Sequence, residues 1–214
     1  MRPAEKTLPE ATLERLTLYR RVLERLGAAG LETVSSEVLA DAAGVNPAIL
    51  RKDLSMLGSF GRRGVGYGVM QLAGSIATTL GLNNDWRVGI VGAGNLGRAL
   101  AGYAGFRENG FRLVGLYDAD ASLVGRRYAD LVVADAAGLE DAVLAEGINM
   151  AVLAVPAAAA QELCDRLVAA GVRNILNFAP VVLQVPPDVV LRKVDMAREL
   201  QLLAYYATTP GSHL

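Results

Sequence analysis

The fold is decided by Arg87-Val88-Gly89-Ile90-Val91-Gly92-Ala93-Gly94-Asn95-Leu96-Gly97, where a short β-branched strand runs into a glycine motif that opens a helix. The first glycine of such a motif permits a tight turn. The second lets backbone approach a pyrophosphate, and the third lets the helix pack close to the strand. The first N–H groups of that helix then face the phosphates. The motif predicts a dinucleotide-binding loop formed by Gly92, Ala93, Gly94, Asn95, Leu96 and Gly97.

Strands and helices alternate after this motif. Further strands are predicted at 113–117, 150–155 and 174–178, an edge strand at 189–191, and helices at 139–146 and 157–170. Strands that alternate with helices and are apolar almost throughout are typical of a parallel sheet covered on both faces. The pattern therefore predicts an α/β domain with a doubly wound parallel sheet of the Rossmann type.

Asp118 ends the second predicted strand, 21 positions after Gly97. A carboxylate at this point accepts hydrogen bonds from the adenosine ribose and repels a 2′-phosphate, which favours NAD(H) over NADP(H). The alternative is that Asp118 caps a following helix. Ligands of open α/β sheets lie over the carboxyl ends of the strands. We therefore expect the nicotinamide near Val155, Pro156, Asn177, Ala179 and Pro180.

The N-terminal part of the chain has a helical pattern instead. An apolar stripe that includes Leu16 and Leu23 predicts a helix from about Pro9 to Ala28. Ser35 or Ser36 is a natural cap for a second helix at 37–43. Asn46 then caps a third helix that begins at Pro47 and runs to about Leu57. Two short helices joined by a glycine turn are typical of a helix-turn-helix.

A glycine-rich segment follows the third helix. Residues 58–68 hold five glycines around Arg62 and Arg63, which predicts a hairpin wing with cations at its tip. Residues 44–68 carry four Lys or Arg and one Asp, in a chain of net charge −1. A locally basic surface on a nearly neutral protein fits a specific DNA contact. We therefore expect a winged helix at the N-terminus, ending in the polar turn 81–85.

The composition sets further limits. Hydrophobic residues make up 52% of the chain, which suits packed cores, and the single Cys164 allows no intrachain disulfide. The N-terminus lacks the apolar core of a signal peptide. No apolar run reaches the roughly 18 residues of a membrane span. The expected location is the cytoplasm, with no contact to a membrane.

The candidate catalytic groups are few. A dehydrogenase needs a proton donor or acceptor beside the transferred hydride. The only histidine is His213, next to last in the chain, and Tyr103 is followed at the Tyr-x-x-x-Lys spacing by Arg107. No catalytic residue and no metal ligand set is predicted, which favours a sensor over an enzyme.

Three other interpretations stay open at this point. They are an NAD-dependent enzyme of unfamiliar type, a CoA-binding or other nucleotide-binding regulatory module, and a DNA-binding protein without a ligand. Asp118 argues against the second and the intact glycine loop against the third.

The whole chain resembles the bacterial redox-sensing transcriptional repressor family Rex. The motifs that carry the resemblance are 51–55, 64–67, 92–97, 103–106 and 175–183. The resemblance implies a homodimer whose last helix, about Met196 to Ala207, is exchanged between subunits. It also implies that NADH closes the dimer and releases the inverted-repeat operator DNA of respiratory and fermentative genes. The expected domains are a winged helix (1–83), an NAD(H)-binding Rossmann domain (84–194) and the exchanged helix (195–214).

The resemblance also implies roles for single residues. Asn46, Arg51, Lys52 and Ser55 would belong to the DNA surface, and Arg62 and Arg63 would enter the minor groove or hold phosphate. Tyr103 and Asp195 resemble a pair that links the subunits, joined by Arg21 in one state, and Tyr103 and Met196 would also border the cofactor. Met56 and Met196 stand where the family usually has aromatic residues. Methionine fills such a site but stacks less well.

The predicted last helix is apolar on nearly every side. Little polar surface is left on this helix, so we expect it to be buried on several sides. Its large apolar and aromatic residues are Leu200, Leu202, Leu203, Tyr205 and Tyr206. A core helix within one chain is the alternative to exchange between subunits.

Overall fold

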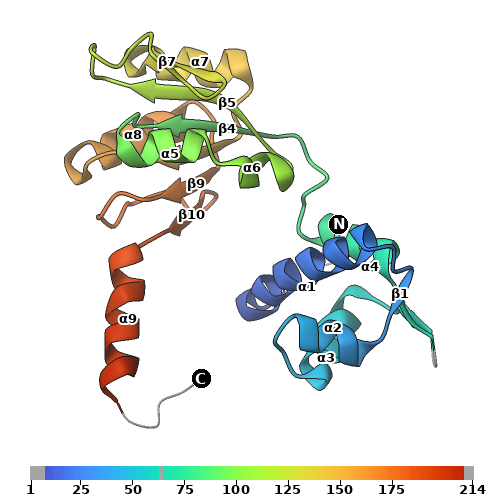
Figure 1. Ribbon diagram of the computed structural model, residues 1–214. Coiled ribbons are helices and arrows are strands. Elements are labelled where there is room, and N and C mark those ends of the chain that lie inside the picture. Colours follow the sequence, from blue (N-terminus) through green and yellow to red (C-terminus); the bar gives the residue numbers. More distant parts are fainter. Residues whose placement is uncertain (1–7, 63–64, 210–214) are drawn as a thin grey trace. The chain divides into compact units, whose positions relative to one another are not determined.

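The computed structural model describes residues 8–62 and 65–209. The chain forms two compact units, Met1–Asn84 and Asp85–Leu214, which Figure 1 shows with their elements labelled. No helix of the described residues is long and apolar enough to cross a membrane.

Unit 1 is a winged helix. Its elements are α1 (Glu10–Ala28), β1 (Thr33–Val34), α2 (Ser36–Ala42), α3 (Pro47–Leu57), β2 (Gly61–Arg62), β3 (Gly66–Gly68) and α4 (Val69–Thr79). The capping residues act as predicted. The Ser35 side chain accepts the N–H of Val38, and Asn46 Oδ1 accepts that of Ala48 at 2.8 Å. The two-residue strand β1 was not predicted from the sequence. It pairs with β3, which is the central strand of the three and pairs with β2 on its other side.

One apolar core holds unit 1 together. Helix α1 packs on α4. Leu16 and Leu23 of the predicted stripe are fully buried, and so is Tyr19 on the same helix. From the other helices, Leu39, Leu50 and Leu72 enter the same core. Burial of an aliphatic or aromatic side chain contributes about 1.5–3 kcal/mol, so this core sets the position of the two short helices.

Unit 2 is built on a seven-stranded sheet. The strands are β4 (Trp86–Val91), β5 (Phe111–Asp118), β6 (Arg127–Tyr128), β7 (Leu131–Asp135), β8 (Met150–Leu153), β9 (Asn174–Asn177) and β10 (Val190–Lys193). Their order is β10-β9-β8-β4-β5-β7-β6, and only β6 is antiparallel. The six parallel strands, counted along the chain, lie in the order 3-2-1-4-5-6 of a Rossmann domain. The predicted fold is confirmed.

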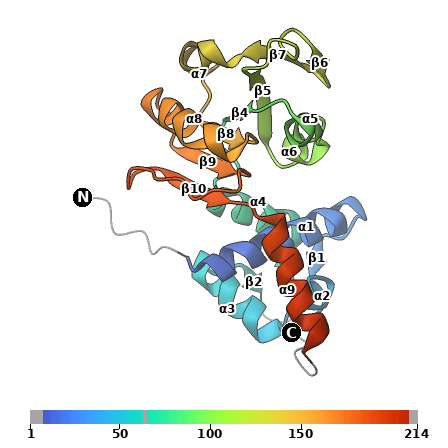
Figure 2. The ribbon, with the colours of Figure 1, turned by 90° about the vertical axis from the view of Figure 1, so that its left-hand side faces the viewer.

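Apolar clusters lie on both faces of this sheet. The helical elements are α5 (Asn95–Ala101), α6 (Ala104–Glu108), the 3₁₀ turn η1 (Ala136–Gly138), α7 (Leu139–Glu146), α8 (Ala157–Ala169) and α9 (Met196–Thr208). Cys164 on α8 is fully buried, and burial raises the pKa of its thiol. Figure 2 shows α8 and α5 covering the sheet from different sides.

Helix α9 is not covered by its own chain. Every residue of α9 is exposed, and Leu200 and Leu203 keep 66% and 63% of their surface accessible. The alternative of a core helix within one chain is therefore wrong. An all-round apolar helix that finds no cover in its own chain leaves a surface suited to a partner.

Candidate cofactor site and nucleic-acid interface

The glycine loop leaves the carboxyl end of β4 at the point where the strand order reverses. This point lies between β4 and β8, where dinucleotides bind in open α/β sheets. Gly92 has a φ of +103°, and a Cβ there would lie 2.4 Å from the Ala154 carbonyl oxygen. A Cβ on Gly97 would lie 1.7 Å from the Gly92 carbonyl oxygen. Both positions therefore exclude any side chain.

Gly94 has a different role from these two. A Cβ on Gly94 would meet no atom of the chain within 4 Å, and both Gly94 and Asn95 are exposed. The space above Gly94 is thus open toward solvent, as required where a backbone receives a pyrophosphate. Helix α5 begins at Asn95, so its first N–H groups have no acceptor within the helix.

Asp118 at the end of β5 is tied to the glycine loop. Its Oδ2 accepts the N–H of Ala93 at 2.6 Å, and its Oδ1 accepts the N–H of Asp120 at 2.8 Å. The residues directly after Asp118 form turns and no helix, so the helix-cap alternative is wrong. Each carboxylate oxygen has a further lone pair for a ligand hydroxyl.

The ends of β8 and β9 form the other side of the predicted site. Val155 is half-buried, and its methyl group would lie 2.9 Å from a Cβ on Gly92. Asn177 is 1% exposed: its side chain accepts the N–H of Ala179 and donates to the carbonyl oxygens of Ala179 and Val181. The amide of Asn177 is therefore used within the loop 177–181, where Ala179 is also buried and Pro180 is exposed.

Arg98, which the sequence interpretation did not single out, lies beside the glycine loop. Its guanidinium donates to Asn95 Oδ1 at 2.5 Å and to the Tyr128 hydroxyl at 3.3 Å. Its central carbon lies 5.2 Å from the centre of the Tyr128 ring. The guanidinium lowers the pKa of Tyr128 by hydrogen bonding. Its place directly after Gly97 was the available signal.

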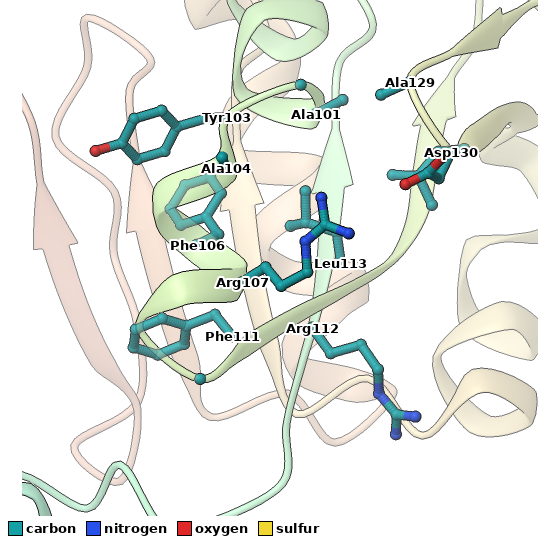
Figure 3. Close-up of a pocket in the computed structure, with 13 residues that line it drawn as sticks. Ala101, Tyr103, Ala104, Phe106, Arg107, Phe111, Arg112, Leu113, Ala129 and Asp130 are labelled. Carbon is teal, nitrogen blue, oxygen red and sulfur yellow. The ribbon is translucent and has the colours of Figure 1, made fainter. Parts of the chain in front are cut away.

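A cavity of about 460 Å³ lies near the amino ends of β5 and β7, the ends opposite to those that meet the glycine loop. It is lined by the end of α5, by α6, and by the starts of β5 and β7, so it is away from the carboxyl ends that meet the glycine loop. Figure 3 shows Tyr103 and Phe106 on one side of it, with Ala129 and Asp130 on the other. This cavity is not the predicted cofactor site.

The helix-turn-helix presents its polar side chains on α3. Arg51, Lys52 and Ser55 are exposed, as is Met56. Arg51 Nη1 lies 3.0 Å from both Ser36 Oγ and Glu37 Oε1, whereas the Ser55 hydroxyl donates to the Lys52 carbonyl oxygen. Asn46, at the start of α3, uses its side-chain oxygen as the helix cap.

Asp53 faces the other way on the same helix. It is 1% exposed, and its carboxylate accepts hydrogen bonds from three side chains of α1. Arg15 donates from Nε at 2.7 Å and from Nη2 at 2.8 Å, Tyr19 at 2.9 Å and Thr12 at 3.1 Å. Burial by itself raises the pKa of Asp53, but these donors outweigh it and hold the pKa below its usual value. They fasten α3 to α1.

The wing begins with β2 and β3. A Cβ on Gly66, which has a φ of +94°, would lie 2.3 Å from the Val34 carbonyl oxygen, so the wing strand approaches β1 closely. Arg63 lies outside the described residues, and the structure describes the backbone of Arg62 but not its side chain.

The residues expected to couple the subunits lie on both units. Arg21 on α1 is exposed. Tyr103 is 58% exposed and its ring contacts Phe106 edge to face. The Asp195 carboxylate caps α9 through the N–H of Arg198 and lies 3.0 Å from Lys193 Nζ. Among the described residues, no hydrogen bond joins Tyr103 to Asp195 within one chain, and no cluster of acidic, His or Cys residues is placed to hold a metal.

Two family models match the chain. The "CoA binding domain" covers residues 83–181, and the "Putative DNA-binding protein N-terminus" covers residues 7–55. The redox-sensing transcriptional repressor Rex of Streptomyces coelicolor is 54% identical over 96% of this chain and 80% of its own length. That of Carboxydothermus hydrogenoformans is 48% identical over 92% of this chain and 95% of its own.

Solved structures of RSP, a Rex-family repressor, are similar throughout. The structure of RSP with β-NAD⁺ and operator DNA has a TM-score of 0.89 and 37% identity, and covers 94% of this chain and 93% of RSP. The structure with β-NADH has a TM-score of 0.83 and 35% identity, and covers 94% and 95%. Relatives this similar over nearly all of both chains share one fold. The chain belongs to the redox-sensing transcriptional repressors of the Rex family, which are regulators rather than enzymes.

Proposed function

We propose that this protein is a DNA-binding repressor that senses the NADH/NAD⁺ ratio and leaves its operator when NADH rises. The observation that carries the proposal is the glycine loop at the switch point of unit 2, fastened to Asp118. The same chain holds a winged helix with exposed cations on α3. A ligand site and a DNA surface in one chain are what linkage between cofactor and operator requires.

In this proposal the glycine loop 92–97 binds the pyrophosphate through backbone N–H groups. Asp118 accepts hydrogen bonds from the adenosine ribose. Val155, Pro156 and Pro180 border the nicotinamide. Asn177 and Ala179 are buried, and they support the site by holding the loop that carries Pro180. Tyr103 lies beyond the far end of α5 from the glycine loop, so we assign it to subunit coupling.

The proposed DNA surface is α3 with the wing. Arg51 and Lys52 face the major groove, Ser55 lies on the same exposed side, and Asn46 sets the start of the helix. Arg62 and Arg63 reach the minor groove or a phosphate from the wing. Cations placed in this way supply both base contacts and phosphate neutralisation.

The exposed apolar helix α9 supports a homodimer. In the proposal, α9 of each subunit packs against its partner, and Met196 at its start borders the partner's nicotinamide. Asp195 pairs with Tyr103 across the interface, and Arg21 joins them in one state. A two-fold dimer predicts an inverted-repeat operator with half-sites about one helical turn, or a multiple of it, apart.

We assign the chain to a winged helix at 1–83, a Rossmann domain at 84–194 and an exchanged helix at 195–214, and we place it in the cytoplasm. By family resemblance, its targets are respiratory and fermentative genes.

Calorimetric titration of the purified protein with NADH, NAD⁺, NADPH and CoA tests the cofactor site. We expect NADH to bind more tightly than NADPH, because Asp118 repels a 2′-phosphate, and CoA not to compete with NADH. Tighter binding of CoA would replace the redox proposal by the alternative of a CoA-binding regulator.

A further inference from the structure

Glu37 and Arg51 form an ion pair on the exposed side of the helix-turn-helix. Arg51 Nη1 lies 3.0 Å from Glu37 Oε1 and 3.0 Å from Ser36 Oγ. The pair links the first turn of α2 to the middle of α3, and its side chains remain 51% (Arg51) and 67% (Glu37) exposed. It therefore lies where a ligand of α3 can reach it.

The two acceptors use one nitrogen of the Arg51 guanidinium. That nitrogen carries two hydrogens, which match the two acceptors, and the Nε and Nη2 edge keeps three N–H groups. This edge has the spacing that pairs with O6 and N7 of guanine. Ser36 and Glu37 thus set the plane of the guanidinium and leave its base-reading edge open.

The charge of Glu37 is costly on such a surface. Binding to any duplex is driven by neutralisation of phosphates, and an exposed carboxylate opposes it. Asp53, the neighbouring acid on α3, avoids this conflict because it is buried and paired with Arg15. The ion pair also acts on Tyr67 of the wing. Burial raises the pKa of Tyr67, the charge of Arg51 lowers it and the charge of Glu37 raises it.

We propose that Glu37 determines operator specificity by positioning Arg51 for base reading and by penalising contacts made with phosphates alone. This inference rests on the proposed function, because it takes α3 as the DNA-reading helix. An arginine held before binding has less side-chain freedom to lose on contact with its base. Specificity is a difference between two affinities, and Glu37 acts on both.

The test uses a duplex that the wild-type protein selects from a randomised pool without NADH. The protein is also titrated with duplexes that each carry one base-pair substitution in the selected sequence, and with a scrambled duplex. The variants are Glu37→Gln, Arg51→Gln, their combination, and Asp41→Asn as a matched control. Asp41 is exposed on the same helix and makes no ion pair among the described residues. Arg51→Gln identifies the base pair that Arg51 reads.

We expect Glu37→Gln to reduce the ratio of the affinities for the selected and the substituted base pair by about fivefold. This is a part of the discrimination that a bidentate contact supplies. Discrimination elsewhere should change by less than about twofold, and the scrambled duplex should bind more tightly. In the Arg51→Gln background, Glu37→Gln should have no further effect on discrimination, as expected for residues that act together. Asp41→Asn should keep discrimination at every base pair.

The inference is overturned if Glu37→Gln tightens the selected and scrambled duplexes by the same factor with discrimination intact. That result would make Glu37 a general charge. Failure of the proposed function is distinguishable, because the wild-type protein itself would then enrich no duplex from the randomised pool. That outcome would remove the inference as well.

Discussion

The Asp118 carboxylate accepts the N–H of Ala93 at 2.6 Å, which fastens the end of β5 to the loop that follows β4. One side chain thereby orders the loop, and we propose that the remaining lone pairs of its carboxylate accept the ribose hydroxyls. In the predicted complex Asp118 has two roles, and its removal affects both.

Asp118→Ala is expected to weaken NADH binding by about tenfold to a hundredfold. A hydrogen bond to a charged group contributes about 1.5–3 kcal/mol, and the substitution removes the ribose acceptor together with the loop anchor. Calorimetric NADH titration measures the change. Asp120→Ala is the matched control, because Asp120 is exposed and its side chain caps only the turn at Ser122. Unchanged affinity in Asp118→Ala, or a larger loss in the control, would contradict the assignment.

Alanine substitutions at two glycines of the loop are expected to affect stability and NADH binding differently. Gly94→Ala meets no atom of the chain, so the melting temperature should be kept while NADH binding falls at least about tenfold, because the methyl group fills the phosphate space. Gly97→Ala should lose both, since its Cβ would overlap the Gly92 carbonyl oxygen.

Gly74→Ala provides the control for these substitutions. Gly74 is exposed in α4 with no atom near its Cβ position, and alanine should stabilise the helix by about 0.5–1 kcal/mol without any effect on NADH. Thermal unfolding and NADH titration of the three variants settle the comparison. Wild-type NADH affinity in Gly94→Ala would show that the pyrophosphate does not approach this backbone.

Asp53→Asn is expected to destabilise unit 1 by about 1.5–3 kcal/mol, because the donors of α1 lose a charged acceptor. Hydrogen exchange should increase in α1 and α3 together. Asp41→Asn, on the surface of the same unit, should stay within about 0.5 kcal/mol. Equal exchange rates in wild type and Asp53→Asn would refute the role of Asp53 as the link between the helices.

The same group predicts a pH dependence of stability. The folded pKa of Asp53 lies below its unfolded value of 3.8. Its contribution is therefore fully present above about pH 4 and is lost as the pH falls through the folded pKa. Wild-type unfolding free energy should fall in that range, and Asp53→Asn should show a smaller fall.

Leu203→Glu on α9 is expected to shift the protein from dimer to monomer. Leu203 is 63% exposed in the single chain, and a charge in a buried apolar interface is strongly unfavourable. Light scattering after size-exclusion chromatography gives the mass. Gln201→Glu adds the same charge on the same helix and should leave the dimer intact. A monomeric wild type would remove the dimer from the account.

Most of the fold follows from local patterns in the chain. The strand of Val88 and Ile90 before the glycine loop, and the capped helices at Ser35 and Asn46, are each signalled within a few residues. The hairpin of β6 and β7 was missed although Leu131–Ala134 is a continuous apolar run. The run is only four residues long and only Val133 in it is buried, and the two residues of β6, Arg127 and Tyr128, give no strand signal of their own.

Long-range pairs could not be predicted in this way. In the sequence Asp53 is the single acid of a basic segment, and nothing near it shows that it is buried against Arg15, 38 positions away. Thr12, Arg15 and Tyr19 recur at helical spacing on one face of α1, which was the available signal. The hydrogen bonds of the Asn177 side chain are local by comparison, since they join it to Ala179 two residues on.

Fluorescence polarisation of a labelled operator tests the central claim most directly. The duplex selected by the wild-type protein is titrated at fixed salt with NADH, with NAD⁺ or without cofactor. The account predicts that NADH weakens binding about fivefold or more, as a coupling of at least about 1 kcal/mol requires, and that NAD⁺ leaves the complex intact. Equal binding in all three conditions would contradict it, because unit 2 would then not report the redox state to the winged helix.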